Sequence, residues 1–225
     1  MGRVGRDETG QVRRMDATGQ QRSSTIRTHG EDTFPFVGGA LALDLVNTEV
    51  VVRGKPRDLL AAPGDVARWW QAARSRYPAA DRVSAGDATL VYDEALLAAL
   101  TRLRGAVRRI VTAMVAGIAP APDDLATLNA VLRTGYHSLD VAPDGHVLPG
   151  YRTDDAGKGA LLLPVALSAF RLVAQGRRAR LHKCANERCV LFLYDATRSA
   201  TRRWCSVACK DRARKMEHYQ RARAM

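Results

Sequence analysis

The chain has 225 residues, 46% of them hydrophobic, which allows one domain with an appendage or two small domains. Its formal net charge is +12, and residues 177–225 contribute +10 of this, from 14 Lys and Arg against 4 Asp and Glu. A basic module of this kind is typical of a polyanion binder, the plainer alternative being a solvated face. No apolar run reaches the roughly 18 residues of a membrane span, which excludes a transmembrane protein.

Residues 1–32 mix charged, polar and small residues without periodicity, which predicts a disordered leader. The apolar core of a signal peptide is missing from the opening MGRVGRDETGQVRR. We therefore expect a cytoplasmic protein whose thiols are reduced.

The globular part is expected to open with a turn at Gly38 and Gly39, followed by the almost wholly apolar run 40–48. Asp44 and Asn47 interrupt this run three residues apart, a spacing that places both on one face of a helix. Buried polar side chains must find hydrogen-bond partners, so these two either hold neighbouring backbone or line a ligand pocket, with Trp69 as a third lining residue. The structural role is the favoured interpretation.

Two helical patterns follow. Pro63 begins a helix through Tyr77, with Asp65 as its N-cap and with Trp69 and Trp70 giving one ring to the core. Residues 93–117 carry the clearest helical period, an apolar stripe formed by Leu96, Leu100, Leu103, Val107, Ile110 and Met114. The arginines of this segment lie largely off the stripe and are expected to be solubilising: Arg102, Arg104, Arg108 and Arg109.

Two further helices are expected at 123–133 and 156–175, the second kinked or begun at Pro164. Between them, Asp144-Gly145 separates the short runs 136–141 and 146–151, which indicates a β-hairpin. The predicted fold class is therefore mainly α with a small β-hairpin (α+β). In it, a helical domain at 33–176 precedes a small zinc-stapled ββα-like finger at 177–225.

Four cysteines, the only ones in the chain, have the spacing C-x4-C-x15-C-x3-C: Cys184, Cys189, Cys205 and Cys209. Two close pairs joined by a loop of this length are typical of a zinc site, because each pair presents two thiolates to one metal ion. Four thiolates leave no position for a catalytic water, so the single zinc ion is expected to be structural. Two disulfides, or four unrelated buried thiols, are the alternatives. His182 is a substitute ligand that the four thiolates make unnecessary.

Around these cysteines the sequence predicts two short strands, 179–183 and 191–194, and a basic helix from Lys210 to about Ala222. Ser206 is the expected N-cap, which places Cys209 in the first turn, where the positive helix end favours a thiolate. The helix and the loop before it carry cations that suit phosphate contacts. The predicted nucleic-acid-binding residues are Arg198, Arg202, Arg203, Lys210, Arg212, Arg214 and Lys215.

This segment resembles the CGNR zinc finger in Tyr194-Asp195, Arg198, Arg202-Arg203-Trp204-Cys205-Ser206, Cys209 and Arg212, with Lys215 and Tyr219 beyond. The run Leu43-Asp44-Leu45-Val46-Asn47-Thr48 is similar to the opening of the ABATE domain, which precedes that finger in bacterial proteins. The resemblance implies a stress-related transcription regulator with a largely helical N-terminal domain. Lys210-Asp211 replace the family's Gly-Asn, but Arg212 is retained, so metal binding is expected to persist.

Three functions are consistent with these features. The first is a transcriptional regulator acting at the nucleoid, whose finger contacts DNA and whose N-terminal domain senses a small-molecule effector or forms a homodimer. The second is an RNA-associated or ribosome-associated zinc module, which the sequence alone does not separate from the first, although the lack of stacking aromatics on the finger argues against single-stranded RNA. The third is a small-molecule sensor without direct DNA readout. No catalytic grouping accompanies Asp44, Asn47 and Trp69, so we do not expect an enzyme.

Overall fold

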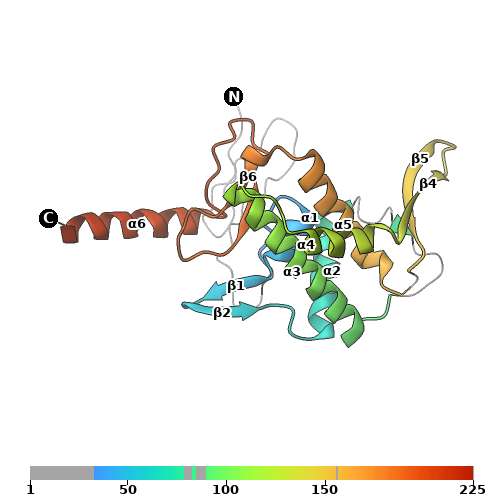
Figure 1. Cartoon of the computed structure of the whole chain (residues 1–225), viewed down its shortest axis with the longest axis horizontal. Coiled ribbons are helices and arrows are strands. Elements are labelled where there is room, and N and C mark those ends of the chain that lie inside the picture. The colour runs from blue at the N-terminus through green and yellow to red at the C-terminus, as the bar shows by residue number, and fades with distance from the viewer. Residues whose placement is uncertain (1–32, 79–82, 85–89, 156, 225) are drawn as a thin grey trace, which may run out of the picture. The chain divides into compact units, whose positions relative to one another are not determined.

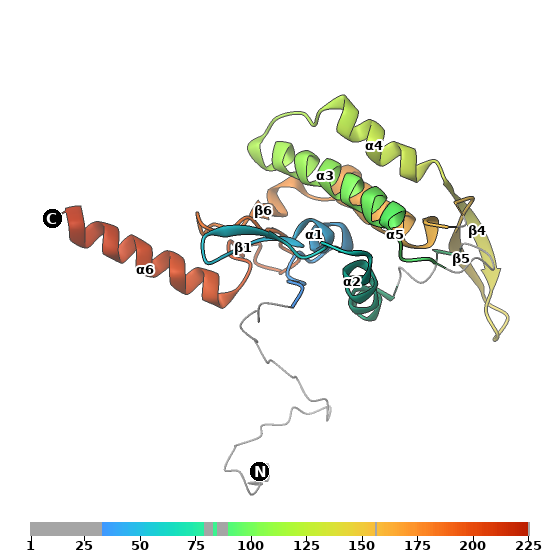
Figure 2. The same cartoon turned by 90° about the horizontal axis from the view of Figure 1, so that it is seen from below.

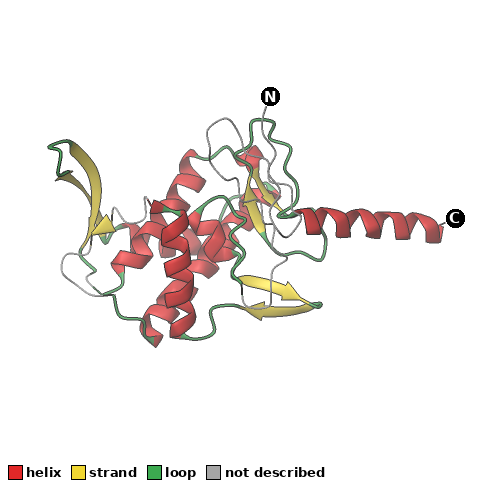
Figure 3. Cartoon of the chain, turned by 180° about the vertical axis from the view of Figure 1, so that it is seen from behind, coloured by secondary structure: helices red, strands yellow, loops and turns green. Residues whose placement is uncertain are grey.

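The computed structural model describes residues 33–78, 83–84, 90–155 and 157–224, which belong to one compact unit, and the predicted leader 1–32 lies outside them. The helices are α1 (Leu41–Val46), α2 (Pro63–Arg76), α3 (Glu94–Ala116), α4 (Pro122–Leu132), α5 (Gly159–Phe170) and α6 (Val207–Ala224). The strands are β1 (Glu49–Val52), β2 (Lys55–Asp58), β3 (Val83–Ser84), β4 (Gly135–Val141), β5 (Val147–Thr153), β6 (Leu181–Lys183) and β7 (Phe192–Tyr194). The predicted fold class is confirmed, because helices predominate and the strands form small sheets (Figures 1 and 3).

The short helix α1 lies in the middle of the helical core, and all six of its residues are buried. It packs against α3 and α5 and also contacts β7. The backbone N–H of Ala42 donates to Ser168 Oγ on α5 at 3.1 Å. A helix of this length is unstable alone, so its apolar packing holds it, at roughly 1.5–3 kcal/mol for each large side chain buried.

The long helix α3 confirms the clearest sequence pattern. Its predicted stripe is buried except for the partly buried Met114. Asp93 is the N-cap, and its side chain accepts the Leu96 N–H at 2.7 Å. Gly117 ends the helix with a φ of 84°, a left-handed conformation that glycine adopts without a Cβ clash.

The start of α2 differs from the prediction. Ala62, not Asp65, is the N-cap residue, and Asp65 Oδ2 accepts the Ala61 and Ala62 N–H groups at 2.9 and 3.0 Å. The reason is that Pro63 is the first helical residue, since its fixed φ suits that position, which puts Asp65 in the third. Trp69 and Trp70 are both buried, whereas only one ring was expected in the core.

The hairpin β4–β5 is present, and β3 pairs in parallel with β5 to complete a three-stranded sheet. The helix predicted for 156–175 begins at Gly159, so Pro164 lies inside it and does not begin it. A π-helical turn, Arg171–Gln175, continues α5. None of the described helices is long and apolar enough to cross a membrane.

Three arginines of α3 do more than solubilise the helix. The largely exposed Arg109 donates through Nε to the buried Asp124 of α4 at 2.7 Å. The Arg104 side chain is only 1% exposed, and it forms a bidentate pair with Asp58 at 2.7 and 2.6 Å and donates to Thr48 Oγ1 at 2.8 Å. Arg108 is partly buried and pairs with Glu49. Both carboxylates lie at the base of the β1–β2 hairpin, opposite its turn. The hairpin is therefore held on α3 by ion pairs to the buried Arg104 and the partly buried Arg108.

We predict that removing the acid of the buried pair destabilises the fold more than removing the base. Asp58→Asn leaves the Arg104 charge buried without its main partner, which should lower the free energy of unfolding by about 2 kcal/mol. This is less than the roughly 3 to 5 kcal/mol lost when a fully buried pair is broken, because Glu49 remains near Arg104. Arg104→Leu leaves only the half-exposed carboxylates of Asp58 and Glu49, which water can solvate. Urea unfolding would give both free energies.

The matched control is Arg102→Leu, because Arg102 is an exposed residue of the same helix and its loss should stay within about 0.5 kcal/mol. A larger loss of stability for Arg104→Leu than for Asp58→Asn would show that the guanidinium contributes mainly by packing.

Candidate zinc centre and basic helix

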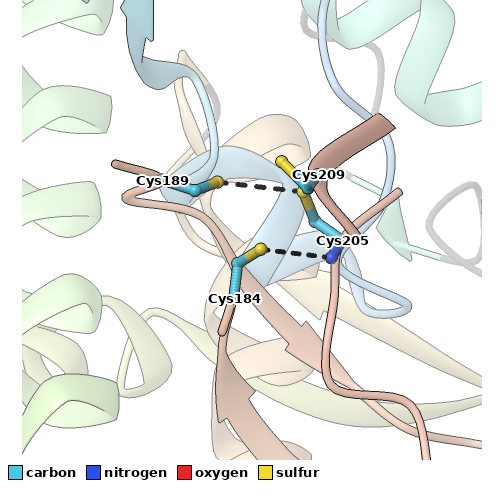
Figure 4. A group of neighbouring side chains, drawn as sticks. All are labelled: Cys184, Cys189, Cys205 and Cys209. Carbon is cyan, nitrogen blue, oxygen red and sulfur yellow. Dashed lines mark hydrogen bonds between the residues drawn. The ribbon is translucent and has the colours of Figure 1, made fainter. Parts of the chain in front are cut away.

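The C-terminal module is built on a short antiparallel ribbon, β6 paired with β7, which confirms the two predicted strands. The loop between the strands closes on itself, because Cys184 N–H donates to Leu191 O and Cys189 N–H donates to Asn186 O, each at 2.8 Å. These bonds shape the first knuckle and turn Cys184 and Cys189 toward the second cysteine pair (Figure 4).

The four Sγ atoms lie within 4.8 Å of one another, and the Cys189 and Cys205 sulfurs are 3.8 Å apart. Four thiolates about 2.3 Å from a tetrahedral zinc ion would have Sγ–Sγ distances of about 3.8 Å, so the observed group fits one zinc ion. Within the described part of the chain, the cluster consists of the four cysteines without His182. All four are free thiols, so the disulfide alternative is not what the structure has.

The second knuckle leads into α6. Ser206 Oγ accepts the Cys209 N–H at 3.2 Å, and Ser206 O accepts the Lys210 N–H at 3.1 Å. The predicted cap and the position of Cys209 in the first turn are therefore confirmed, and α6 begins at Val207, directly after the cap. The partial positive charge of this helix end stabilises a thiolate at Cys209.

Sequence reasoning missed the role of Asp195, a fully buried residue that orders the loop before the second knuckle. Its carboxylate accepts the Thr197 hydroxyl at 2.6 Å, the Thr197 N–H at 2.9 Å and the Arg202 N–H at 2.7 Å. The hydrogen bond from the Thr197 hydroxyl is the main reason that the pKa of Asp195 is lowered to about 2. An Asp two residues before a Thr is an Asx-turn signal that could have indicated this loop.

The predicted nucleic-acid-binding residues do not share one environment. Arg198, Arg203, Arg212, Arg214 and Lys215 are exposed. The cations of Arg203 and Lys210 lie 5.6 and 5.9 Å from the centroid of the Trp204 ring.

Arg202 is different, because its guanidinium is used inside the protein. It donates to Val37 O at 2.9 Å and to Cys205 O at 3.0 Å, and so ties the second knuckle to the segment before α1.

One amide joins the module to the helical core. Asn47 Nδ2 donates to Phe192 O at 2.8 Å, and Asn47 Oδ1 accepts the Phe192 N–H at 2.8 Å. Nearby, the Tyr194 N–H donates to Gly38 O at 2.7 Å. Leu181 and Phe192 belong to the same buried cluster as α1 and α3, so β6 and β7 are part of the main core.

The three residues predicted as a ligand pocket are all buried, and two of them hold backbone. Asp44 accepts the Gly38 N–H at 2.6 Å and the Tyr77 hydroxyl at 2.5 Å, while Asn47, which follows α1 instead of lying within it, binds Phe192. Trp69 Nε1 has no hydrogen-bond partner among the described residues. Two surface cavities in the described structure, one beside β4 and α5 and one beside α3 and β7, are lined by other residues.

Comparison with known families gives two matches. Residues 39–176 match the ABATE model, described as "Putative stress-induced transcription regulator", and residues 180–222 match the CGNR zinc finger. The family resemblance and the order of its two parts are therefore confirmed. No match was found among curated proteins.

We predict that Asn47→Ala lowers both the stability of the fold and the affinity of the cysteine cluster for zinc. The change leaves the N–H and C=O of Phe192 buried without partners, which should lower the free energy of unfolding by about 2 to 4 kcal/mol. Because β7 then loses its anchor, zinc should pass faster to a chromophoric chelator. Asn129→Ala on the exposed face of α4 is the control. Unchanged zinc release would mean that the knuckles hold the metal without help from α1.

Asp44 gives a pH prediction. Burial raises its pKa from 3.8 to about 6, in spite of the hydrogen bond from Tyr77. A raised pKa means that the folded protein binds the proton more tightly, so this contribution is complete below pH 4 and is lost as the pH rises through 6. The loss by pH 7 is about 3 kcal/mol.

The measurement is the difference in unfolding free energy between the wild type and Asp44→Asn at each pH, in which the acid sensitivity of the zinc site cancels. The variant keeps a hydrogen-bonding side chain without the charge, so it should gain on the wild type between pH 4 and pH 7. A constant difference across this range would contradict the raised pKa.

Proposed function

Because this chain belongs to the ABATE family and carries a CGNR zinc finger, it is a regulatory zinc-binding protein, and we propose that it regulates transcription by binding DNA through the finger and α6. Both matched families are of regulatory or zinc-finger type and neither is an enzyme family. The observation that carries the proposal is a strongly basic helix that is anchored at the zinc site and extends away from the rest of the described chain (Figures 1 and 2).

The cations of α6 occupy two opposite faces. At 3.6 residues per turn, Arg212, Lys215 and Arg223 share one face, while Lys210, Arg214 and Arg221 share the other. A helix lying on a flat anionic surface needs cations on one face only. A helix between two phosphate backbones uses both, so this arrangement favours a DNA groove over a membrane surface.

The dimensions of α6 suit the major groove. A helix with side chains is about 10–12 Å across, and the groove is about 12 Å wide. The first turn is held by the zinc site through Cys209, so the angle at which the helix leaves the finger is set by the metal. Most contacts would be to phosphates, which position the helix without reading the sequence.

The helical N-terminal part would supply the regulation. Its tight joint with β7 means that an effector or a second copy of the chain bound to it could change the position of the finger. We therefore assign it effector sensing or homodimer formation, and assign the protein to the nucleoid.

The first test is selection from a random duplex DNA library with zinc-loaded protein near physiological salt, with a chelator-treated sample as control. An enriched motif that disappears with the metal is the expected result. The DNA affinity of the wild type is then compared with that of the triple variant Arg212→Gln, Arg214→Gln and Lys215→Gln, in which Gln keeps the helix propensity. The affinity of this variant should depend less steeply on salt: the magnitude of the negative slope of log affinity against log salt should decrease by about 0.9 for each phosphate that is no longer neutralised.

The matched control removes three cations elsewhere, with Arg102→Gln, Arg133→Gln and Arg171→Gln on other exposed positions. It should leave the slope nearly unchanged. Equal decreases in the two triple variants would indicate attraction by net charge alone. Retention of single-stranded RNA in preference to duplex DNA would replace the proposal with an RNA-binding role.

A further inference from the structure

The β1–β2 hairpin has an unusual turn. Val52 pairs with Lys55, so the loop consists of Arg53 and Gly54, and their φ angles are 51° and 82°. Positive φ at both positions is the type I′ turn, for which Asn-Gly or Asp-Gly is the favoured pair. An arginine in the left-handed region is disfavoured by its Cβ, so the fold holds a cation at the apex against its conformational preference.

Charge is divided along the hairpin. The two carboxylates, Glu49 and Asp58, lie at its base and pair with Arg108 and Arg104 of α3. The end of the hairpin, residues 52–57, carries Arg53, Lys55 and Arg57 and no acidic residue, and all three side chains are exposed. Three cationic side chains are therefore gathered at the tip, although β1 and β2 taken whole are nearly balanced.

The hairpin is fixed to the zinc module as well as to α3. Val50 packs against the buried cluster that contains Cys184, Cys205 and Cys209. Arg108 also donates to Glu49 O and to Val190 O, both at 3.4 Å, and so bridges β1 and the first knuckle. The tip of the hairpin projects toward the same side of the described structure as α6 in both views (Figures 1 and 2).

We propose that the β1–β2 hairpin is a second DNA-contacting element, a wing whose Arg53, Lys55 and Arg57 bind the phosphate backbone beside the stretch bound by α6. The inference rests on the proposed DNA binding, and it extends the interface from the finger into the N-terminal part of the chain. Because the wing and α6 are attached to the same cysteine cluster, one rigid base would present both to the duplex.

The test measures the affinity of zinc-loaded protein for a mixed-sequence DNA duplex across roughly 0.05 to 0.2 M salt. The wing variant is Arg53→Gln, Lys55→Gln and Arg57→Gln, compared with the α6 triple variant and the triple control at Arg102, Arg133 and Arg171. The magnitude of the negative slope of log affinity against log salt should decrease by about 0.9 for each cation removed from a phosphate, or roughly 2.7 for the whole wing. Zinc content and far-UV dichroism should match the wild type.

A single variant separates folding from binding. Arg53→Asn creates the Asn-Gly pair that the turn prefers, so the variant should keep the folded hairpin, with the zinc content and far-UV dichroism of the wild type. Its salt slope should nevertheless fall by about 0.9. An intact fold together with weaker DNA binding is the signature of a residue that contributes to binding.

The outcomes are distinct. If the α6 variant binds DNA more weakly while the wing variant and Arg53→Asn keep the wild-type slope, the proposal that the hairpin contacts DNA is overturned and the proposed function stands. In that case, Lys55 and Pro56 serve only to protect an exposed strand edge. If the wild-type protein does not bind duplex DNA with a salt-dependent affinity, both the wing and the proposed function are overturned.

Discussion

The structure depends on one buried amide. A primary amide offers a donor and an acceptor in the same geometry as a peptide group, so the Asn47 side chain pairs with β7 at Phe192 as a neighbouring strand would. Asn47 follows a helix whose six residues are all buried, so it has little freedom to move. The register of β7, and through it the first cysteine knuckle, is thereby set by the helical core.

The same amide makes metal binding and folding interdependent. Zinc contributes about 10–16 kcal/mol of apparent binding free energy in small finger peptides, where it largely folds the chain. Here β6 and β7 also bury Leu181 and Phe192 in the main core. The helical part therefore prearranges the first knuckle, and zinc in turn secures strands that cover α1 and α3. The two parts are joined at β7 by the hydrogen bonds of Asn47 and by shared apolar packing.

Local patterns were readable from the sequence, and long-range partners were not. The stripe of α3, the Asp144-Gly145 turn and the cysteine spacing each lie within a short window, so periodicity and turn chemistry predicted them correctly. Arg104 has the pattern of a surface residue because its partner, Asp58, is 46 residues away. Asn47 finds Phe192 145 residues later, so its need for a partner was predictable but the partner was not. The prediction that Asp65 is the N-cap of α2 was wrong for a local reason, because Pro63 occupies the first helical position.

The joint made by Asn47 recognises only main-chain atoms of the finger, at the residue where β7 begins, and makes no demand on the side chains of α6. Substitutions that alter α6 can therefore accumulate without disturbing the connection. In evolutionary terms, the sequence of α6 can diversify while the Asn47 joint is inherited unchanged. A single helical N-terminal architecture could in this way be passed among paralogues whose C-terminal helices differ.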